Sequence, residues 1–430
     1  MKVAVIGLWH QGVVGAACLA DLGYDVLAAD TDRERVDRLT EGKAPLYEPG
    51  LDELLRKGLD SRRLQFTTDL SAAVRARPNI LLMFDTPVDD NDDSDLGEIL
   101  AAVSAIAPHL EPDAVILVTA QVPVGTCDEI HQMTRRAVAY IPENLQLGQA
   151  IERFRTPPLP VVGADDNATL DRIEALLAPL PVQWQRVSLR TAEMTKHALN
   201  SFLAVSICFA NELGNLCDEV GADGRRLAEV LRLEPRIGAK ARLSPGLGFS
   251  GGTLARDMQT LRKLGDRNGI ETPFLDGAWV SNQRQNRTVI HKLKQNLGEN
   301  LRGRRIAILG LTYKPETSTL RRSAALEIAG ELIREGAEVW ASDPRASRDE
   351  LRAYPALHFV ENPYDAIRQG DALVLMTPWK QYRELDFAAI RSGMTTPLLI
   401  DTANLWNADD LISLGFLYID IGSGRTRRRI

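Results

Sequence analysis

The chain has 430 residues, which is long for a single hydrophobic core and predicts two or three domains. Apolar residues make up 44% and charged residues 25% of it, as in an ordinary globular protein. The formal net charge of −7 argues against a surface for nucleic acid or membranes, and no apolar run is long enough to span a bilayer. The basic tail at residues 425–430 is interpreted as a solvated chain end, with a local anion contact as the alternative.

The cysteines and histidines give no sign of a metal site or a disulfide framework. The four cysteines contain no CxxC pair, and the six histidines lack the spacing of metal ligands. The first residues run directly into an apolar strand, which leaves no room for a signal peptide. We therefore expect a cytoplasmic protein with reduced thiols and no structural metal. The cysteines are Cys18, Cys127, Cys208 and Cys217.

Short apolar strands alternate with helical stretches in residues 1–187. This alternation predicts βαβ units and a parallel sheet of the Rossmann type, with a helix from Val13 to Leu22 after the first strand. A ligand site in such a sheet lies at the carboxyl ends of the strands. The expected strands are KVAVIG, YDVLAAD, RLQFT, NILLMF, AVILVTA and a short one before Pro142; their ends bring Gly7, Asp30, Thr86 and Gln121 to one edge.

Residues 188–300 form a different, helical segment. Apolar residues recur at steps of three and four along 188–220, which predicts one long helix. Because Leu199, Leu203 and Ile207 lie off this stripe, we expect the helix to be buried on several sides, as a domain connector or a subunit interface. The stripe comprises Met194, Ala198, Phe202, Val205, Phe209, Leu213 and Leu216.

The strand–helix alternation restarts in residues 301–430. RRIAILGL and EVWASDP repeat the first two strands of the chain, and Gly310 and Asp343 stand where the first lobe has Gly7 and Asp30. A helix is expected from Ser323, followed by the strands DALVLMTP and PLLIDTAN. The predicted fold is therefore α/β, with two Rossmann-like doubly wound lobes joined by a long central helix.

The turn GLWHQG after the first strand predicts a dinucleotide site, with an unusual residue in it. Gly7 and Gly12 have the spacing of a pyrophosphate-binding turn, but Trp9 stands where backbone normally approaches phosphate through a glycine. Asp30, 23 residues after Gly7, is placed to bond ribose hydroxyls and favours NAD over NADP, although it could simply cap the next helix. His10 and Gln11 supply further donors to the cofactor, and the indole of Trp9 either turns away from the phosphates or covers the cofactor.

Two further groups of residues are candidates for binding or catalysis. Lys196 and Asn200 are four residues apart on the predicted long helix, so they share one face. They either belong to a solvated surface or hold an alkoxide or sugar oxygen. The glycine-rich segment 244–257, which ends in Arg256 and Asp257, is either a flexible connection or a wall of backbone against a ligand.

These features together resemble the UDP-glucose/GDP-mannose 6-dehydrogenases over essentially the whole chain. The passages that carry the resemblance are DTDRERVDRLTEGKAPLYEPGLDELL, VPVGT, PENL, AEMTKHALNSFLAVSICFANEL, EPRIGAKARLSPGLGFSGG and GLTYKPETSTLRRS. Members of this family oxidise the C6 alcohol of a nucleotide sugar twice, with NAD as hydride acceptor and a cysteine thiohemiacetal and thioester as intermediates. The resemblance further implies a nucleotide-binding carboxyl-terminal lobe and a homodimer built on the central helix.

The resemblance also implies roles for individual residues. Glu143 matches a glutamate that acts in proton transfer, Lys196 and Asn200 match an oxyanion-stabilising pair, and Asp257 matches the partner of that lysine. Arg236 matches an arginine that reaches the nucleotide sugar from the neighbouring subunit. The implied cofactor site comprises Gly7, Trp9, His10, Gln11, Gly12, Asp30, Arg35, Thr86, Pro87, Gln121, Arg256 and Arg321, and the implied substrate site comprises Glu143, Asn144, Leu145, Lys196, Asn200, Arg236, Phe249, Gly251 and Lys314.

The chain departs from the family pattern in the loop that carries the catalytic cysteine. The family loop GGSC, followed by KD, is GGTLARD here, so either Thr253 or Leu254 occupies the position of the cysteine and neither has a thiol. A threonine hydroxyl needs an adjacent base before it is a nucleophile, so the thioester route is expected to be closed. Thr253 and Gln121, which replaces a threonine that positions water, remain candidate catalytic residues.

Two further replacements concern the substrate. Leu147 replaces a second glutamate, and Ala403 replaces an arginine that helps to hold the nucleotide. With Glu143, Lys196, Asn200 and Asp257 retained, the leading prediction is an NAD-dependent oxidoreductase of nucleotide sugars that removes one hydride or oxidises an aldehyde hydrate. The alternatives are an epimerase-like enzyme that returns the hydride from retained NAD and a non-catalytic nucleotide-sugar-binding protein.

Overall fold

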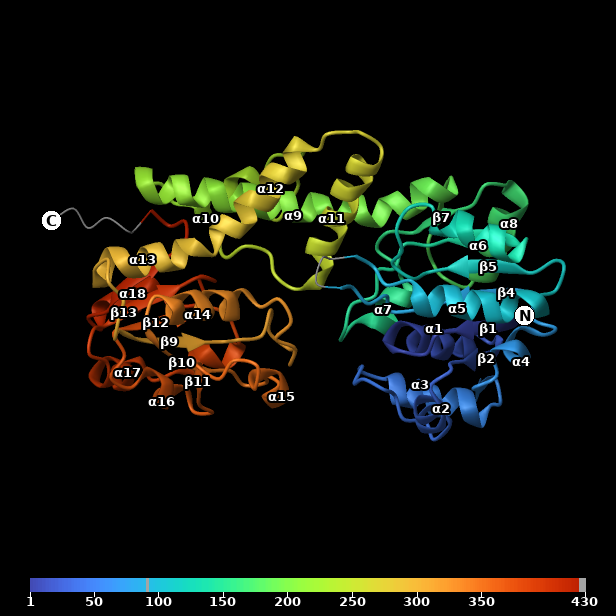
Figure 1. Cartoon of the computed structure of the whole chain (residues 1–430), viewed down its shortest axis with the longest axis horizontal. Coiled ribbons are helices and arrows are strands. Elements are labelled where there is room, and N and C mark those ends of the chain that lie inside the picture. Colours follow the sequence, from blue (N-terminus) through green and yellow to red (C-terminus); the bar gives the residue numbers. More distant parts are fainter. Residues whose placement is uncertain (90–92, 425–430) are drawn as a thin grey trace. The chain divides into compact units, whose positions relative to one another are not determined.

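The computed structural model describes residues 1–89 and 93–424. It divides into two compact units, Met1–Leu199 and Asn200–Ile430 (Figure 1). The long helix predicted at 188–220 is α9 (Leu189–Val220), and the division falls inside it. The segment predicted as a separate middle domain is therefore grouped mostly with the carboxyl-terminal lobe. The prediction for the tail at 425–430 lies outside the described residues.

Within residues 1–89 and 93–199 the strands form one eight-stranded sheet of order β3-β2-β1-β4-β5-β6-β7-β8. All neighbouring pairs are parallel except β6 and β7. The strands are β1 (Lys2–Ile6), β2 (Asp25–Ala29), β3 (Leu64–Thr67), β4 (Asn79–Leu82), β5 (Val115–Val118), β6 (Ala137–Tyr140), β7 (Val161–Gly163) and β8 (Gln185–Val187). The sheet confirms the predicted parallel Rossmann lobe, and β7 and β8 extend it beyond the strands expected from sequence.

Helices cover both faces of this sheet (Figure 1). They are α1 (His10–Asp21), α2 (Arg33–Thr40), α3 (Leu51–Asp60), α4 (Leu70–Val74), α5 (Gly97–Ile106) with the 3₁₀ turn η1 (Ala107–His109), α6 (Thr126–Thr134), α7 (Ala150–Arg155) and α8 (Asn167–Leu177). The start predicted for α1, Val13, is wrong by one turn, since the helix begins at His10 with Trp9 as its N-cap. The apolar run that follows is buried from Val13 to Ala20, which seats α1 against the sheet.

The second unit holds the carboxyl-terminal part of α9, a set of helices and a second parallel sheet of order β11-β10-β9-β12-β13-β14. Its strands are β9 (Arg305–Leu309), β10 (Glu338–Ser342), β11 (His358–Phe359), β12 (Ala372–Leu375), β13 (Leu398–Asp401) and β14 (Leu417–Asp420). Its helices are α10 (Gly224–Leu231), α11 (Gly252–Arg267), α12 (Pro273–Gln285), α13 (Arg287–Leu297), α14 (Ala324–Arg334), α15 (Arg348–Leu351), α16 (Pro363–Ile367), η2 (Lys380–Glu384), α17 (Phe387–Gly393) and α18 (Ala408–Ser413).

The two lobes share one local hydrogen-bonding arrangement, at the equivalent glycine and aspartate positions noted in the sequence. In the first lobe the Asp30 carboxylate accepts a hydrogen bond from the Leu8 amide at 2.7 Å, just after Gly7. In the second lobe the Asp343 carboxylate accepts one from the Leu311 amide, also at 2.7 Å, just after Gly310. The acid that ends the second strand therefore anchors the turn after the first strand in both lobes.

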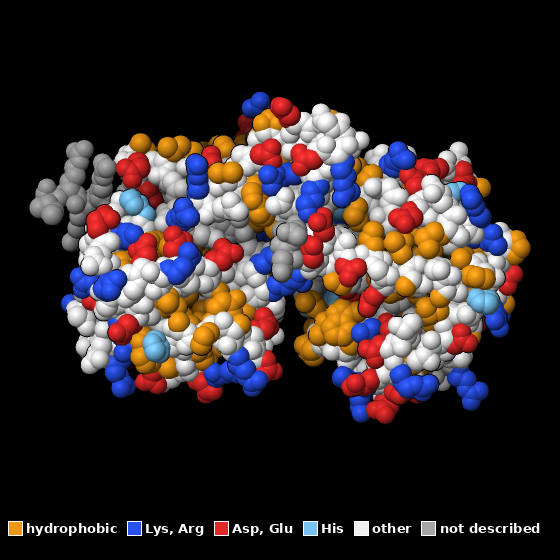
Figure 2. All heavy atoms as spheres, in the orientation of Figure 1, with side chains coloured by type: hydrophobic (Ala, Val, Ile, Leu, Met, Phe, Trp, Pro, Cys, Tyr) orange, Lys and Arg blue, Asp and Glu red, His pale blue; other side chains and the backbone are white. Residues whose placement is uncertain are grey.

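Several apolar side chains of the predicted stripe on α9 are exposed in the single chain, so burial of this face by a second subunit stays a prediction. Phe202 is 70% exposed and Leu216 is 62% exposed. The side of α9 that packs inward is instead rich in polar residues. These buried polar residues are Glu193, Lys196, His197, Asn200, Ser201, Asn211 and Asp218. On the face seen in Figure 2, acidic and basic side chains are intermixed, as expected for the modest net charge.

Candidate active site

The turn between β1 and α1 has the backbone geometry that a dinucleotide requires. Gly7 has φ of +93°, in the left-handed region that favours glycine. A Cβ at Gly12 would stand 1.7 Å from the Gly7 carbonyl oxygen, so only glycine fits there. A cavity of about 290 Å³ opens beside this turn, and Gly7, Trp9, Asp30 and Arg35 are among its lining residues. The glycine turn and the cavity fit a bound dinucleotide.

Trp9 forms one wall of this cavity and stacks on Arg35. The Arg35 guanidinium lies 5.1 Å from the centre of the indole ring, and its Nη1 donates to the Asp30 carboxylate at 2.8 Å. Trp9 is 39% exposed, so the indole stands at the surface and does not fill the turn. The replacement of glycine by tryptophan therefore adds an aromatic wall beside the residues predicted to hold the ribose, and leaves the turn intact.

The side chains of His10 and Gln11 both make hydrogen bonds within the protein. The His10 ring is buried and bonds the Glu48 carboxylate at 3.1 Å. The Gln11 side chain donates to the Phe84 carbonyl at 3.0 Å and accepts from the Thr119 hydroxyl at 3.0 Å. These contacts hold the turn in place, and neither side chain lines the 290 Å³ cavity. A direct cofactor contact from either side chain stays a prediction.

Glu48 is a positioning residue that the sequence analysis missed. Its buried carboxylate accepts from the His10 ring and from the backbone amides of Gly148 and Ala150, both at 2.9 Å. It therefore ties the dinucleotide turn to the segment that follows Glu143. No spacing rule could have found it, because Glu48 lies 38 or more residues from each of its partners.

Lys196 and Glu143 face each other in the first unit. The Lys196 ammonium lies 3.8 Å from the Glu143 carboxylate and 3.5 Å from the Asn144 side-chain oxygen. The two charged side chains are only 9% and 17% exposed, so their attraction is less screened than at a surface. Glu143 also accepts from the Leu145 amide, which fixes its orientation. This pair can hold an oxygen substituent and accept a proton from it.

The segment after β5 is held by two buried residues of α9. Glu193 is fully buried and accepts from the backbone amides of Gly125 and Cys127 at 2.7 and 2.9 Å. The His197 ring bonds the Val122 carbonyl at 2.9 Å. The predicted site residue Gln121, itself buried, therefore adjoins a segment clamped to α9. Glu193 and His197 were missed because a clamp on backbone atoms leaves no sequence motif.

Asn200 and Asp257 meet in the second unit. The Asn200 amide donates to the Asp257 carboxylate, and both side chains are buried. Asp257 lies in the second turn of α11, whose first turn carries Thr253 and whose N-cap is Gly251, with φ of +78°. The structure therefore joins Lys196 to Glu143 and Asn200 to Asp257. The assembly of all four in one site stays a prediction.

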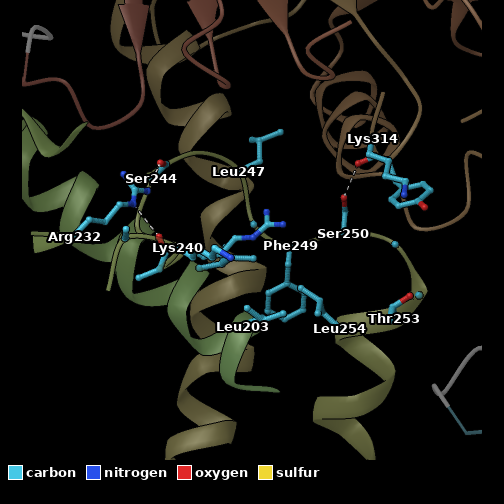
Figure 3. Close-up of a pocket in the computed structure, with 18 residues that line it drawn as sticks. Leu203, Arg232, Lys240, Ser244, Leu247, Phe249, Ser250, Thr253, Leu254 and Lys314 are labelled. Atoms are coloured by element: carbon cyan, nitrogen blue, oxygen red, sulfur yellow. Dashed lines mark hydrogen bonds between the residues drawn. The ribbon is translucent and has the colours of Figure 1, made fainter. Parts of the chain in front are cut away.

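A pocket of about 790 Å³ lies in the second unit, over the glycine-rich segment (Figure 3). Four residues predicted for catalysis or substrate binding line it: Phe249, Gly251, Thr253 and Lys314. Asn144 and Leu145 line a different, smaller and largely apolar cavity in the first unit, together with Glu143 and Gln11.

The remaining predicted site residues fall into two groups. Thr86 and Pro87 line the 290 Å³ cavity beside the dinucleotide turn. Arg236, Arg256 and Arg321 lie in the second unit, where Arg236 is 88% exposed and pairs with Glu234 at 2.8 Å. An exposed Arg236 points to no partner inside the described chain beyond that acid, so its role toward a substrate stays a prediction. Among the described residues no cluster of His, Cys, Asp and Glu could hold a metal ion.

Comparison with known proteins assigns the chain to a family. Models of the UDP-glucose/GDP-mannose dehydrogenase family match residues 1–181 (NAD binding domain), 190–284 (central domain) and 307–408 (UDP binding domain). The UDP-glucose 6-dehydrogenase of Rhizobium meliloti is 35% identical over 98% of this chain and 99% of its own length. That of Pseudomonas aeruginosa is 34% identical over 99% of this chain and 98% of its own. The chain belongs to the UDP-glucose/GDP-mannose dehydrogenase family.

The solved structures agree with this assignment. A UDP-glucose dehydrogenase from Pyrobaculum islandicum superposes with a TM-score of 0.85 at 30% identity, over 98% of this chain and 97% of that one. This dehydrogenase family uses NAD. The residues matched as its NAD binding domain, 1–181, include the Gly7–Gly12 turn, Asp30 and Arg35. The predictions of the family, the enzyme class, the fold and the cofactor are thereby confirmed. In the described part of the chain no helix is long and apolar enough to cross a bilayer.

In this dehydrogenase an acid lies against the first turn of α1. The Gln11 amide, in the first turn of α1, donates to the Asp85 carboxylate at 3.2 Å. In Rossmann lobes the amides at this helix end bind the pyrophosphate. Asp85 also lines the 290 Å³ cavity beside this turn, so we expect its carboxylate to compete with a bound cofactor for a backbone donor and to repel the charge of the cofactor.

Asp85→Asn is expected to lower the dissociation constant of NAD about three- to tenfold, because the change removes a like charge near the pyrophosphate. Calorimetric titration with NAD in the absence of sugar measures this. Glu98→Gln is the matched control, since Glu98 lines the same cavity but is not the acceptor of the Gln11 amide. The affinity of this variant for NAD should change less. Weaker NAD binding by Asp85→Asn would contradict this account of Asp85.

Proposed function

We propose that this dehydrogenase oxidises a nucleotide sugar by removing a single hydride, without a thioester intermediate. The observation that carries the proposal is the state of its thiols. All four cysteines are unpaired and buried, and the sequence position expected for a catalytic cysteine holds Thr253 or Leu254. Oxidation of an alcohol to a carboxylate through a thioester needs an accessible thiolate, so a first oxidation is the step that the chain is equipped to perform.

The chemistry of each thiol supports this reading. Burial raises the pKa of Cys18 and of Cys208 to about 12 and also raises that of Cys217. Cys127 is fully buried in α6, where burial and then the Glu193 carboxylate hold its pKa well above the ordinary value. At neutral pH all four are protonated thiols, which are poor nucleophiles. Cys127 therefore does not replace the missing loop cysteine.

Four side chains have proposed roles in the removal of the hydride. Bound NAD would accept the hydride from the sugar. We propose that Lys196 holds the alkoxide oxygen and that Glu143, 3.8 Å away, receives the proton through an ordered water. Asn200, whose amide donates to the Asp257 carboxylate, would donate a further hydrogen bond to a substrate oxygen. The Thr253 hydroxyl would bind substrate as a donor, since threonine is not ionised near neutral pH.

A substrate panel tests this function. The protein is incubated with NAD and a series of UDP- and GDP-sugars, NADH is followed by absorbance and products are identified by mass. Formation of one NADH per sugar consumed with any member supports the proposal. A changed sugar isomer without NADH would instead identify the epimerase-like alternative. Ligand-dependent thermal stabilisation without any reaction would identify a binding protein.

We also propose a homodimer built on α9 and a cytoplasmic location. Apolar side chains at 202, 209 and 216 are seven residues apart, so they form one stripe, and each is more than half exposed. An exposed stripe of this kind is typical of a surface that another subunit covers. Unpaired cysteines favour a reducing compartment. Within each subunit we propose an NAD-binding domain at 1–187, a dimerisation domain at 188–300 and a nucleotide-binding domain at 301–430.

Phe209→Glu is expected to convert the dimer into a monomer, because it places a charge in the middle of the apolar stripe. Light scattering after gel filtration measures the molecular mass. Leu414→Glu is the control, since it makes the same kind of change at a site that is 44% exposed and away from α9. A wild-type protein that is already monomeric would contradict the proposal.

A further inference from the structure

Glu48 is a buried carboxylate that bonds two other parts of the first unit at once. Its side chain is 1% exposed. One carboxylate oxygen lies 3.1 Å from the His10 ring nitrogen and accepts from the Gly148 amide at 2.9 Å, and the other oxygen accepts from the Ala150 amide at 2.9 Å. Withdrawing a carboxylate from water is costly unless its oxygens receive hydrogen bonds, and such bonds are stronger than neutral ones. The acid is therefore firmly fixed to all three partners.

The contact with His10 reaches the dinucleotide turn. His10 is the first residue of α1 and directly follows Trp9, the N-cap. The backbone amides at this end of a Rossmann helix bind the pyrophosphate of the cofactor. A cofactor bound to these amides fixes the first turn of α1, and with it the ring that bonds Glu48. The position of the Glu48 carboxylate therefore depends on the cofactor-binding turn.

The two amide contacts hold the segment that carries Glu143. Residues 141–149 form no helix or strand, and α7 begins directly after them. The start of this segment is anchored by the Ile141 amide, which donates to the Val118 carbonyl at 3.0 Å. Its far end is anchored by the bonds to Glu48. Glu143 lies between these two anchors, so a shift of the second anchor changes the placement of its carboxylate.

The backbone of Glu48 is held by the start of a third helix. The amide of Leu51, the first residue of α3, donates to the Glu48 carbonyl at 3.1 Å. Helix α1 packs against both α3 and α7 (Figure 1). The starts of three packed helices are therefore bonded to one residue. Packed helices joined by a buried hydrogen-bond network are the kind of structure that carries energetic coupling between two sites.

We propose that Glu48 is a positioning residue that couples cofactor binding to the placement of Glu143. The inference rests on the role of proton acceptor proposed for Glu143 and adds its control by the cofactor. With NAD on the turn, the contact between His10 and Glu48 is set, and the segment is held so that Glu143 faces Lys196. A reacting group displaced by about 1 Å can lose about 10²-fold in rate, so the loss of one anchor is measurable in turnover.

Hydrogen–deuterium exchange tests the coupling without any sugar. Exchange of residues 142–150 is followed with and without NAD in the wild type, in Glu48→Gln and in the control Glu41→Gln, which changes an exposed glutamate that pairs with Lys43. Glutamine has one acceptor oxygen, so one of the two amides would face an NH₂ group. We expect NAD to slow exchange about threefold or more in the wild type and the control, and this protection to be lost in Glu48→Gln. Equal protection in Glu48→Gln would overturn the inference.

A second pair of variants guards against a Glu48→Gln protein that does not fold. His10→Ala removes only the contact on the cofactor side and should lose the protection by NAD in the same way. His10→Gln keeps a side-chain donor for the carboxylate and should restore part of it. Full protection of residues 142–150 in His10→Ala would overturn the inference as well.

Turnover tests whether Glu48 acts through Glu143. With the best sugar of the panel, Glu48→Gln should lower turnover about tenfold in the wild-type background but less than about twofold in the Glu143→Gln background. Equal losses in both backgrounds, or no loss in the wild-type background, would contradict the inference. If Glu143→Gln alone leaves turnover unchanged, the proposed proton transfer fails, and the exchange measurement still decides the coupling.

Discussion

Replacing Lys196 by alanine is expected to lower turnover about 10²–10³-fold while the affinity for NAD stays unchanged. The Lys196 ammonium is nearly buried, 3.8 Å from Glu143 and 3.5 Å from the Asn144 oxygen, so its charge acts in a poorly screened environment. A developing alkoxide gains more from this charge than the bound alcohol does, so the loss falls on turnover. Steady-state kinetics and calorimetric titration with NAD measure the two quantities.

Thr195→Ala serves as the control for this change. The Thr195 hydroxyl donates to the Thr191 carbonyl one turn earlier on α9, at 2.8 Å, so its hydrogen bond is made within the helix. Its loss should leave turnover within about threefold of the wild type. If Lys196→Ala lowers NAD affinity and turnover to the same extent, Lys196 supports the fold of the lobe and does not act on the substrate.

Replacing Asp218 by alanine is expected to have the largest effect on stability, about 3–5 kcal/mol of unfolding free energy. Asp218 and Lys292 form a buried ion pair at 2.8 Å, with side chains 8% and 5% exposed. The same carboxylate accepts from the backbone amides of Gly422 and Gly424 at 3.1 and 3.0 Å, which pins the end of the described chain to α9. The change would leave one charge and two amides buried without their acceptor. Urea denaturation followed by circular dichroism measures the loss.

The double variant Asp218→Ala/Lys292→Met separates charge burial from packing. Removing both partners avoids the unpaired ammonium, so the double variant should be more stable than Asp218→Ala alone. Asp349→Ala, which breaks an exposed pair with Arg352, should change the stability very little. A loss for Asp218→Ala no larger than that for Asp349→Ala would show that solvent reaches this ion pair.

Much of the fold could be predicted from the sequence because its signals are local. Runs such as KVAVI and VILV are buried strands, and glycine with positive φ follows β1 and β9 alike. The short strands β7 and β8 carry too few residues to show a pattern, so they were missed. The extent of helix α9 was predicted correctly, but periodicity alone does not tell which side packs on the same chain and which side is left for a partner or solvent.

The site could be predicted only in part, for a related physical reason. Strand ends and helix spacing indicated Asp30 and Lys196, and the family resemblance added Arg35 and Glu143. The acceptors that orient the site, such as Glu48 and Glu193, bind backbone amides far away in sequence. Such contacts depend on the folded backbone and not on residue spacing, so no pattern in the chain reveals them.

The central claim is that one hydride is removed per sugar, and the ratio of NADH formed to nucleotide sugar consumed tests it most directly. The measurement uses the best substrate of the panel at complete conversion, with the product analysed by mass. We expect one NADH per sugar and a product lighter than the substrate by two hydrogens. Two NADH per sugar, with a newly formed carboxylate in the product, would contradict the account and require a second oxidation that these buried thiols do not explain.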